Sequence, residues 1–223
     1  MPSLEVLQKR IKTTRDLRDI VSTMKSLSSV SILQYDEAAA SLKGYRKNIR
    51  DGFHALLKCR SMPPQPKNRQ GKTLAIVIGS DNGLVGRFNK EILDQAQESL
   101  MQSGISKSDA LFLTVGKRVA VLAENAHLNL FAKYAISNSI KFVNSLAGTI
   151  IMRIYEAMQT YKVSRVEVFY HKREQGKPVS LENILLLPFS EKLVRDLKHK
   201  PWKTNNVPLV TLPTNILIQE LIK

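Results

Sequence analysis

Cysteine is almost missing from this chain of 223 residues, which contains only Cys59. A single cysteine cannot form an internal disulfide and cannot supply the cysteine pairs of a structural zinc site. Long apolar runs are missing too, since no stretch reaches the roughly 20 residues that a membrane span needs. The N-terminus, MPSLEVLQKRIK, enters a charged pattern without the apolar segment of a secretion signal. These absences predict a soluble protein of a reducing compartment, compatible with peripheral membership of a membrane complex.

Acidic residues are scarce. The chain has 19 Asp and Glu against 34 Lys and Arg, which gives a formal net charge of +15. Such a charge favours an acidic partner, whether phosphates, a lipid surface or a carboxylate-rich protein, and does not choose among them. Apolar residues make up 43% of the chain, enough for a sizeable core.

Proline is missing between Ser3 and Leu57, where a helical pattern with a coiled-coil seam runs unbroken. Ser3 is a suitable N-cap for this helix. At about 1.5 Å per residue, the helix is on the order of 80 Å long, so we expect it to project from the rest of the protein. The seam contains seven residues at heptad spacing: Leu7, Thr14, Val21, Tyr35, Leu42, Ile49 and Leu56.

The sequence after this helix predicts a linker over residues 59–72 and an α/β domain over 73–212, with the start of a further helix over 213–223. The long N-terminal coiled-coil helix itself is assigned to residues 1–58. Strand patterns alternate with helical patterns, so we expect a Rossmann-like, largely parallel α/β fold. The strand candidates are 73–79, 110–116, 127–134, 165–172 and 180–189, and the helix candidates are 90–103, 117–124 and 139–161.

The stretch SDNGLVGRFN, residues 80–89, follows the first strand candidate. It has too few glycines for a dinucleotide fingerprint, and it lacks the Gly-Lys-Ser/Thr of a phosphate loop. A tight strand-to-helix turn is the favoured interpretation and phosphate binding the alternative. The residues expected to shape the turn are Asp81, Gly83, Leu84, Gly86 and Asn89. The four histidines are scattered, so the sequence predicts no metal site. It shows no second partner for an acid–base pair, so it predicts no catalytic residue.

Basic residues crowd the first half of the long helix: Lys9, Arg10, Lys12, Arg15, Arg18 and Lys25. A solvated surface is the ordinary explanation of such charges, but this helix is expected to project and meet partners. The first aromatic residue is Tyr35, so stacking on nucleic-acid bases is disfavoured there. Contact with a phosphate backbone stays open as an alternative.

Several segments together resemble the gamma subunit of F-type ATP synthases, the central rotor shaft. The opening SLEVLQKRIKTTRDLRDIVSTMKSLSSVSI is similar to the start of that family, and SDNGLVGRFN is similar to a turn of the family. The segments VEVFYHK and ILLLPF resemble a strand pair that ends in Leu186, Leu187 and Pro188. They occur in the family's order and span nearly the whole chain.

The resemblance implies a noncatalytic subunit that needs no cofactor and couples ion flow to ATP synthesis or hydrolysis by rotation. Its long helix would enter a hexamer of alpha and beta subunits, and its globular domain would touch the epsilon subunit and the membrane c-ring. It would lie peripherally on the cytoplasmic face of a bacterial inner membrane. The residues expected to contact the hexamer are Lys9, Arg10, Met24, Lys25 and Leu27.

This sequence departs from the family pattern at several positions. Asn82 and Arg87 replace a basic residue and a glycine of the turn, and Ser26 and Ser31 stand where Met and Lys are common. The pattern DLRDIVSTMKSL suggests a divergent or alternative bacterial branch. Most of the family's C-terminal helix is expected to be missing, with TNILIQELIK as its beginning.

Two competing functions stay open at this stage. One is a basic nucleic-acid-binding protein with a coiled-coil arm, and the other is a nucleotide-dependent enzyme that uses the 80–89 turn. The sequence does not decide the coupling ion, the organism or the oligomeric state.

Overall fold

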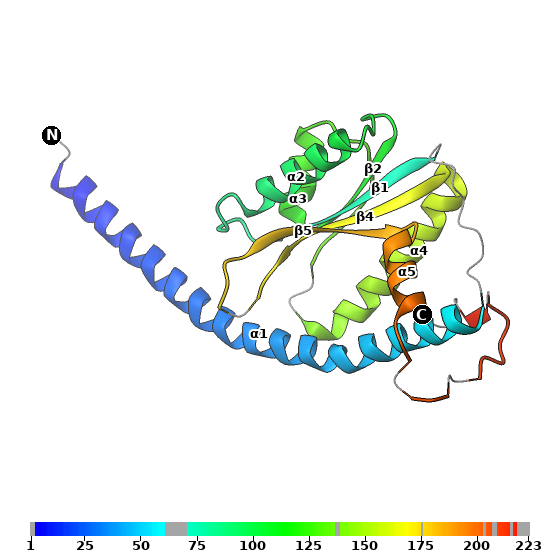
Figure 1. Ribbon diagram of the computed structural model, residues 1–223. Coiled ribbons are helices and arrows are strands. Elements are labelled where there is room, and N and C mark those ends of the chain that lie inside the picture. Colours follow the sequence, from blue (N-terminus) through cyan, green and yellow to red (C-terminus); the bar gives the residue numbers. More distant parts are fainter. Residues whose placement is uncertain are drawn as a thin grey trace. The chain divides into compact units, whose positions relative to one another are not determined.

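The computed structural model describes residues 3–60, 71–136, 139–174, 176–202, 204–206, 209–214 and 216–217, apart from the side chain of Leu193 (Figure 1). The chain divides into two compact units, Met1–Gly52 and Phe53–Lys223. Most of the predicted linker and of the predicted C-terminal helix, residues 61–70, 215 and 218–223, lies outside the described residues. The predicted domain limits therefore stay predictions.

Helix α1 (Leu4–Cys59) is the long N-terminal helix that the sequence predicts, and the prediction is confirmed. Ser3 precedes it, and the Leu7 amide donates to the Ser3 carbonyl at 3.2 Å. Glu5 in its first turn and Lys58 in its last turn carry the charges that the helix dipole favours at each end. Nearly all of its residues up to Gly52 are exposed, whereas its buried residues are all in the next turns: His54, Ala55, Leu56 and Leu57.

A five-stranded sheet forms the centre of the second unit, with strand order β3-β2-β1-β4-β5. Neighbouring strands are parallel except for β4 and β5, which form an antiparallel pair. The predicted largely parallel sheet is thus confirmed. The strands are β1 (Lys72–Ile78), β2 (Ala110–Val115), β3 (Leu130–Tyr134), β4 (Val163–Lys172) and β5 (Ser180–Leu187).

Helices cover both faces of the sheet, with α2 (Phe88–Gln102) and α3 (Lys117–Asn125) on one face and α4 (Val143–Tyr161) on the other (Figure 1). Alternate residues of β1 point to opposite faces, so Ala75 packs in the α2/α3 cluster and Leu74 in the α4 cluster. This double burial explains why the central strands are nearly continuous apolar runs instead of alternating ones.

Three differences from the sequence-based expectation go beyond boundary shifts of one or two residues. Strand β3 starts at Leu130 and not at residue 127, because His127 has a left-handed φ of 50° and its amide closes the turn after α3 on the Glu124 carbonyl at 2.9 Å. A single 3₁₀ turn, Ile140–Phe142, precedes α4 where one longer helix is expected.

The third difference is α5 (Glu191–His199), a helix that the sequence analysis does not include. It is only nine residues long and begins three residues after Pro188, so its period is easily missed. Leu197 is its buried anchor. Within the described part of the chain, every helix is too short or too polar to serve as a bilayer span.

Candidate functional site

The exposed part of α1 carries the residues that the sequence analysis assigns to partner contact. Lys9, Arg10, Met24, Lys25 and Leu27 are all exposed on this helix. At about 100° per residue, the five side chains fall within roughly 160° of the helix circumference. Met24 and Leu27 are neighbours at i and i+3, with 37% and 64% of their surface exposed. The candidate surface is therefore one side of the helix, with two basic residues near its start and a mixed group about four turns later.

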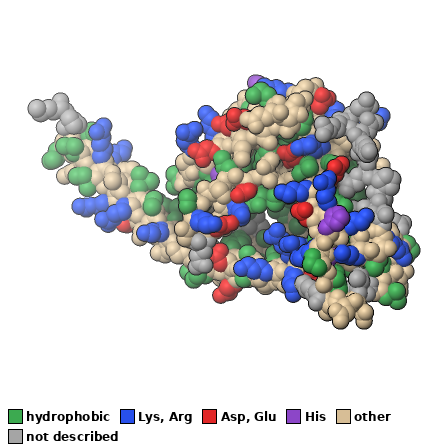
Figure 2. Space-filling model, in the orientation of Figure 1, with side chains coloured by type: hydrophobic (Ala, Val, Ile, Leu, Met, Phe, Trp, Pro, Cys, Tyr) green, Lys and Arg blue, Asp and Glu red, His purple; other side chains and the backbone are tan. Residues whose placement is uncertain are grey.

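The wider set of basic residues does not share that side. Lys12, Arg15 and Arg18 point to the remaining part of the circumference, so positive charge surrounds the first half of α1. Blue Lys and Arg side chains alternate with green hydrophobic ones along the N-terminal helix in Figure 2. A helix of this kind attracts acidic surfaces from any direction, because its potential is not confined to one stripe.

Small hydroxyl side chains line α1 and bond to its own backbone. Six of them donate to the carbonyl four residues earlier, as Thr14 does to Arg10 at 2.8 Å and Ser29 does to Lys25 at 2.9 Å. The others with this contact are Thr13, Thr23, Ser26 and Ser31. Their hydroxyl protons are used within the helix, so they present little directional polarity to a neighbouring surface.

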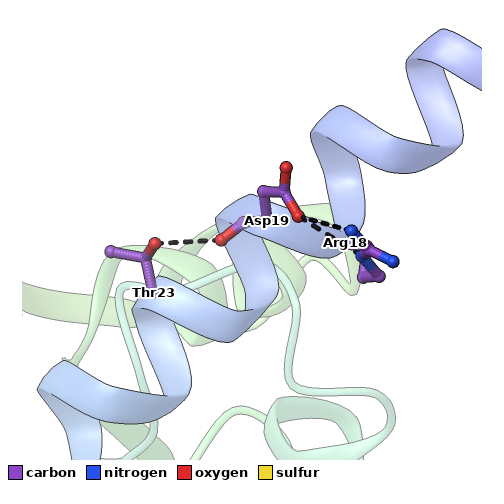
Figure 3. Close-up of polar contacts among 3 residues, drawn as sticks. All are labelled: Arg18, Asp19 and Thr23. Atoms are coloured by element: carbon purple, nitrogen blue, oxygen red, sulfur yellow. Dashed lines mark hydrogen bonds and ion pairs between the residues drawn. The ribbon is translucent and has the colours of Figure 1, made fainter.

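One acid on this part of the helix pairs with its neighbour. Arg18 contacts the Asp19 carboxylate through Nε at 3.3 Å and Nη2 at 3.2 Å, and Thr23 donates to the Asp19 carbonyl at 2.9 Å (Figure 3). Both charged side chains are more than two-thirds exposed, so the ion pair is worth about 1 kcal/mol at most. Arg18 therefore shares its charge with a neighbouring carboxylate and is partly neutralised before any partner binds.

The 80–89 turn is a second place where the sequence analysis locates important residues. Asp81 Oδ1 accepts hydrogen bonds from the backbone amides of Lys117 at 2.7 Å and Ile136 at 3.2 Å. Lys117 is the first residue of α3, and Ile136 follows β3. One carboxylate thus joins the segments that follow β1, β2 and β3.

Asn89 fixes the other end of the turn. Its Oδ1 accepts from the Ser80 amide at 2.7 Å, and its Nδ2 donates to the Ser80 hydroxyl at 2.9 Å. The backbone is crowded beside this pair, since a Cβ on Gly79 would lie 2.5 Å from Asn89 Oδ1. The polar groups of this corner bond to each other and the backbone fills the space beside them. Few free hydrogen-bond donors and little room are therefore left for a phosphate.

The glycines and Leu84 of the turn have different surroundings. Gly86 has a left-handed φ of 57°, and Gly83 lies so close to the Arg118 guanidinium that an added Cβ would be 2.8 Å from Nη2. Leu84 is 75% exposed. The left-handed conformation explains Gly86, whereas a Cβ on Gly83 would meet only the flexible end of the Arg118 side chain, which can move aside. Leu84 stands on the surface without a packing role in this unit.

A ring pair occupies the region where open α/β sheets usually bind ligands. That region lies outside the carboxyl ends of the strands at which the strand order reverses, here β1 and β4. The Phe88 and His171 rings stack there with centroids 3.6 Å apart, and His171 Nε2 lies 2.9 Å from the Phe88 carbonyl oxygen. The sequence analysis missed this contact, because no local pattern links residues 83 positions apart.

Comparisons with known proteins agree with this geometry. A family model described as ATP synthase matches residues 3–222. The ATP synthase gamma chain of Geotalea uraniireducens is 25% identical over 207 residues, covering 90% of this chain and 70% of its own length. The gamma chain of Limosilactobacillus reuteri is 26% identical over 144 residues, covering 60% of this chain and 46% of its own. This chain therefore matches only part of the length of these relatives.

The fold is similar to that of solved ATP synthase chains. One is from the rotor of the Euglena gracilis mitochondrial ATP synthase, with a TM-score of 0.58 and 16% identity, over 97% of this chain and 75% of that one. A second Euglena chain, from a structure of OSCP, F1 and c-ring, has a TM-score of 0.55 and 12% identity, over 81% and 56% of the two chains. These two likenesses concern the fold alone. The match to the ATP synthase family model covers residues 3–222, almost the whole chain. The chain belongs to the ATP synthase family, and the two relatives compared above are gamma chains.

Proposed function

We propose that this protein is a noncatalytic central-stalk rotor subunit of an F-type ATP synthase or ATPase. In this function it couples ion translocation to ATP synthesis or hydrolysis by rotating inside a hexamer of alpha and beta subunits. The observation that carries the proposal is the long exposed stretch of α1 up to Gly52, which has no core of its own within the described part of its unit. A helix that exposes this much surface needs partners to cover it.

The surface chemistry of α1 supports a moving contact over a fixed one. Most of its hydroxyls bond to its own backbone, and its apolar side chains are interrupted by charges on every side. Deep, directional contacts with one subunit of the hexamer would hold the helix against that subunit. An asymmetric helix with shallow contacts can instead bias the open and closed states of successive catalytic sites through small differences in contact free energy.

The remaining partners and the location are part of the same proposal. The α/β unit would contact the epsilon subunit and the membrane c-ring, on the cytoplasmic face of a bacterial inner membrane. The 80–89 turn would be structural, with Asp81 and Asn89 as the residues that hold it. The hydrogen bonds of Asp81 to two amides and of Asn89 to Ser80 support this role.

The test is co-expression of the full chain with the alpha, beta and epsilon subunits of its own organism, followed by native mass spectrometry. We expect one copy of this chain per hexamer. A triple variant, Lys9→Gln, Arg10→Gln and Lys25→Gln, should weaken assembly by about tenfold, since charges at an interface rim act mainly on association.

The matched control removes the same charge from the same helix at other exposed positions: Lys43→Gln, Arg46→Gln and Lys47→Gln. Equal losses in the two triple variants would show that only the overall charge matters, which contradicts the assigned contact side. A wild-type chain that stays outside the hexamer and binds nucleic acid at physiological salt would favour the nucleic-acid alternative.

A further inference from the structure

The last turns of α1 are buried in the α/β unit, in a place apart from the two sheet clusters. Leu56 is completely buried and Leu57 is 4% exposed. Neither residue belongs to the cluster under α2 and α3 or to the cluster under α4. The base of the helix is therefore held by a different part of the unit.

Aromatic contacts show which part this is. The Phe53 ring lies 5.9 Å from the Phe189 ring, and the His54 ring lies 4.8 Å from the Trp202 ring, both in tilted arrangements. Phe189 precedes α5 and Trp202 follows it. In Figure 1 the chain after α5 turns back beside the last turns of α1.

Hydrogen bonds to backbone carbonyls add to these ring contacts. His54 is 3% exposed, and its Nε2 lies 2.9 Å from the Lys200 carbonyl oxygen. Arg60 donates from Nη1 to the Leu212 carbonyl at 2.9 Å and from Nη2 to the Val210 carbonyl at 3.3 Å. The sequence separations are 146, 152 and 150 residues, so chain proximity does not produce these contacts.

We call the five residues that make these contacts the C-terminal clamp: Phe189, Lys200, Trp202, Val210 and Leu212. The clamp is not a helix or a strand, because the residues from Lys200 onward form no strand and, up to Leu212, no helix among those described. Leu209, between two of the contact points, is 88% exposed. The clamp is therefore attached at separate points.

The attachment points on the helix lie at two heights and on two sides. The Arg60 amide bonds to the Leu56 carbonyl at 2.8 Å, so Arg60 continues the last turn. It lies about 9 Å further along the axis than His54, and about 120° around it. Phe53 lies on nearly the same side as Arg60. Two such points resist both rotation of the helix about its axis and tilting of its base.

Apolar burial contributes to this resistance, because turning the helix would expose Leu56 and Leu57, which are 0% and 4% exposed. Burial by itself does not set a precise angle, since apolar contacts are non-directional. Hydrogen bonds and ring contacts depend on angle, and turning the helix breaks them. The directional contacts therefore add to apolar burial and define the rotational angle of the helix base more narrowly.

We propose that the C-terminal clamp is the element that transmits torque between the α/β unit and α1, with His54 and Arg60 as its two attachment residues on the helix. This inference rests on the proposed rotor function. His54 and Arg60 are positioning residues, since they act through the angle of the helix and not by touching a substrate.

The test uses full-length variants of both sides of the clamp. Arg60→Gln removes the two-pronged donor, and Trp202→Ala removes the ring against His54. The controls are Arg46→Gln, which removes an exposed arginine from the same helix, and Leu209→Ala, which truncates an exposed residue of the clamp segment. Trp202→Phe keeps a ring and should behave nearly as the wild type.

The first measurement is hydrogen exchange on the isolated chain. In the clamp variants the amides of residues 54–60 should exchange at least about tenfold faster, while those of β1 stay unchanged because the sheet core is intact. The controls should match the wild type. Unchanged exchange at residues 54–60 in both clamp variants would overturn the clamp. Faster exchange in β1 as well would show general unfolding of Trp202→Ala. Trp202→Phe then decides, because a ring at this position should restore wild-type exchange at residues 54–60 and in β1.

The second measurement is coupling in assembled complexes in vesicles. In the clamp variants the number of ions moved per ATP hydrolysed should fall by about twofold or more, with hydrolysis retained. An unchanged ratio would overturn the torque role. A wild-type chain that never enters the hexamer would refute the rotor function and the torque role with it, whereas the exchange result would still decide whether the clamp holds the helix.

Discussion

Asp81 and Lys117 are joined by a 2.7 Å hydrogen bond from the Lys117 amide to the Asp81 carboxylate. The contact connects the turn after β1 to the first residue of α3, and the same oxygen accepts from Ile136 at 3.2 Å. The turn therefore owes its shape to a side chain that satisfies two amides from distant segments. Its role in the fold can be tested without any partner protein.

Replacing Asp81 should destabilise the α/β unit. Asp81→Ala removes the acceptor of two amides and should lower the free energy of unfolding by about 1 to 2 kcal/mol. Asp81→Asn keeps one acceptor oxygen and should cost about half as much. Urea unfolding should show a lower midpoint with an unchanged slope. Asp94→Asn, on an exposed position of α2, is the control and should leave the midpoint unchanged.

Gly116 and Gly148 should respond in opposite directions to alanine. Gly116 has a φ of 123°, and an added Cβ would lie 2.7 Å from the Ser80 backbone nitrogen. Gly116→Ala should therefore cost about 3 kcal/mol or more. Gly148 is exposed within α4 with open space around it, so Gly148→Ala should stabilise the protein by roughly 0.5 to 1 kcal/mol. The Tm of each variant in thermal unfolding tests these opposite changes. A higher Tm for Gly116→Ala would contradict the backbone geometry assigned to Gly116.

The pair Arg165 and Glu167 should show strong coupling. The Glu167 side chain is 2% exposed and accepts from Arg165 Nε at 2.6 Å, while its Oε2 has no hydrogen-bond partner among the described residues. Arg165→Met leaves a buried carboxylate without its cation and should cost about 2 to 3 kcal/mol.

A double-mutant cycle provides the check on this pair. The variant with both Arg165→Met and Glu167→Met buries no charge, so it should be more stable than Arg165→Met alone. Additive losses from the two single substitutions would mean that the pair contributes no interaction of its own.

Glu174 should titrate below its usual range. The hydrogen bond from Lys172 is the largest cause of the lowered pKa of Glu174, followed by the hydrogen bond from Lys177. A lowered pKa in the folded state means that the contribution to stability is present above the unfolded-state pKa and is lost as the pH falls through the folded-state pKa. NMR titration of the Glu174 carboxyl should show the low pKa, and Lys172→Gln should raise it more than Lys177→Gln does. High salt should weaken the effect, because the group is exposed.

A nucleotide should not stabilise this protein measurably. The corner beside Ser80 is filled by Asn89 and Gly79, and the Phe88–His171 ring pair occupies the switch-point region. We expect a change in Tm below about 1 °C with ATP and magnesium, because only a ligand that binds the folded state raises Tm. A shift that grows with ATP concentration would favour the nucleotide-dependent alternative.

Periodicity was sufficient to predict the main elements. The helical pattern from Ser3 to Leu57 became α1, and each of the five strand candidates contains an observed strand or most of one. These predictions succeed because burial on a sheet or along a helix seam imposes a period of 2 or 3.6 on apolar residues. The short helix α5 was missed for the same reason, since nine residues give the period little room.

The family and the composition of the exposed helix were also determined by the sequence alone. Motifs along the chain specified the gamma-chain resemblance, and the order of Lys, Arg and apolar residues on α1 fixes which side each one occupies. Only the tertiary structure decided that Asp81 holds Lys117 and Ile136, that His171 stacks on Phe88, and that His54 and Arg60 are held by the C-terminal clamp. These contacts join residues 36 to 152 positions apart. Local patterns carry no information on such pairs, because packing of the whole unit brings them together.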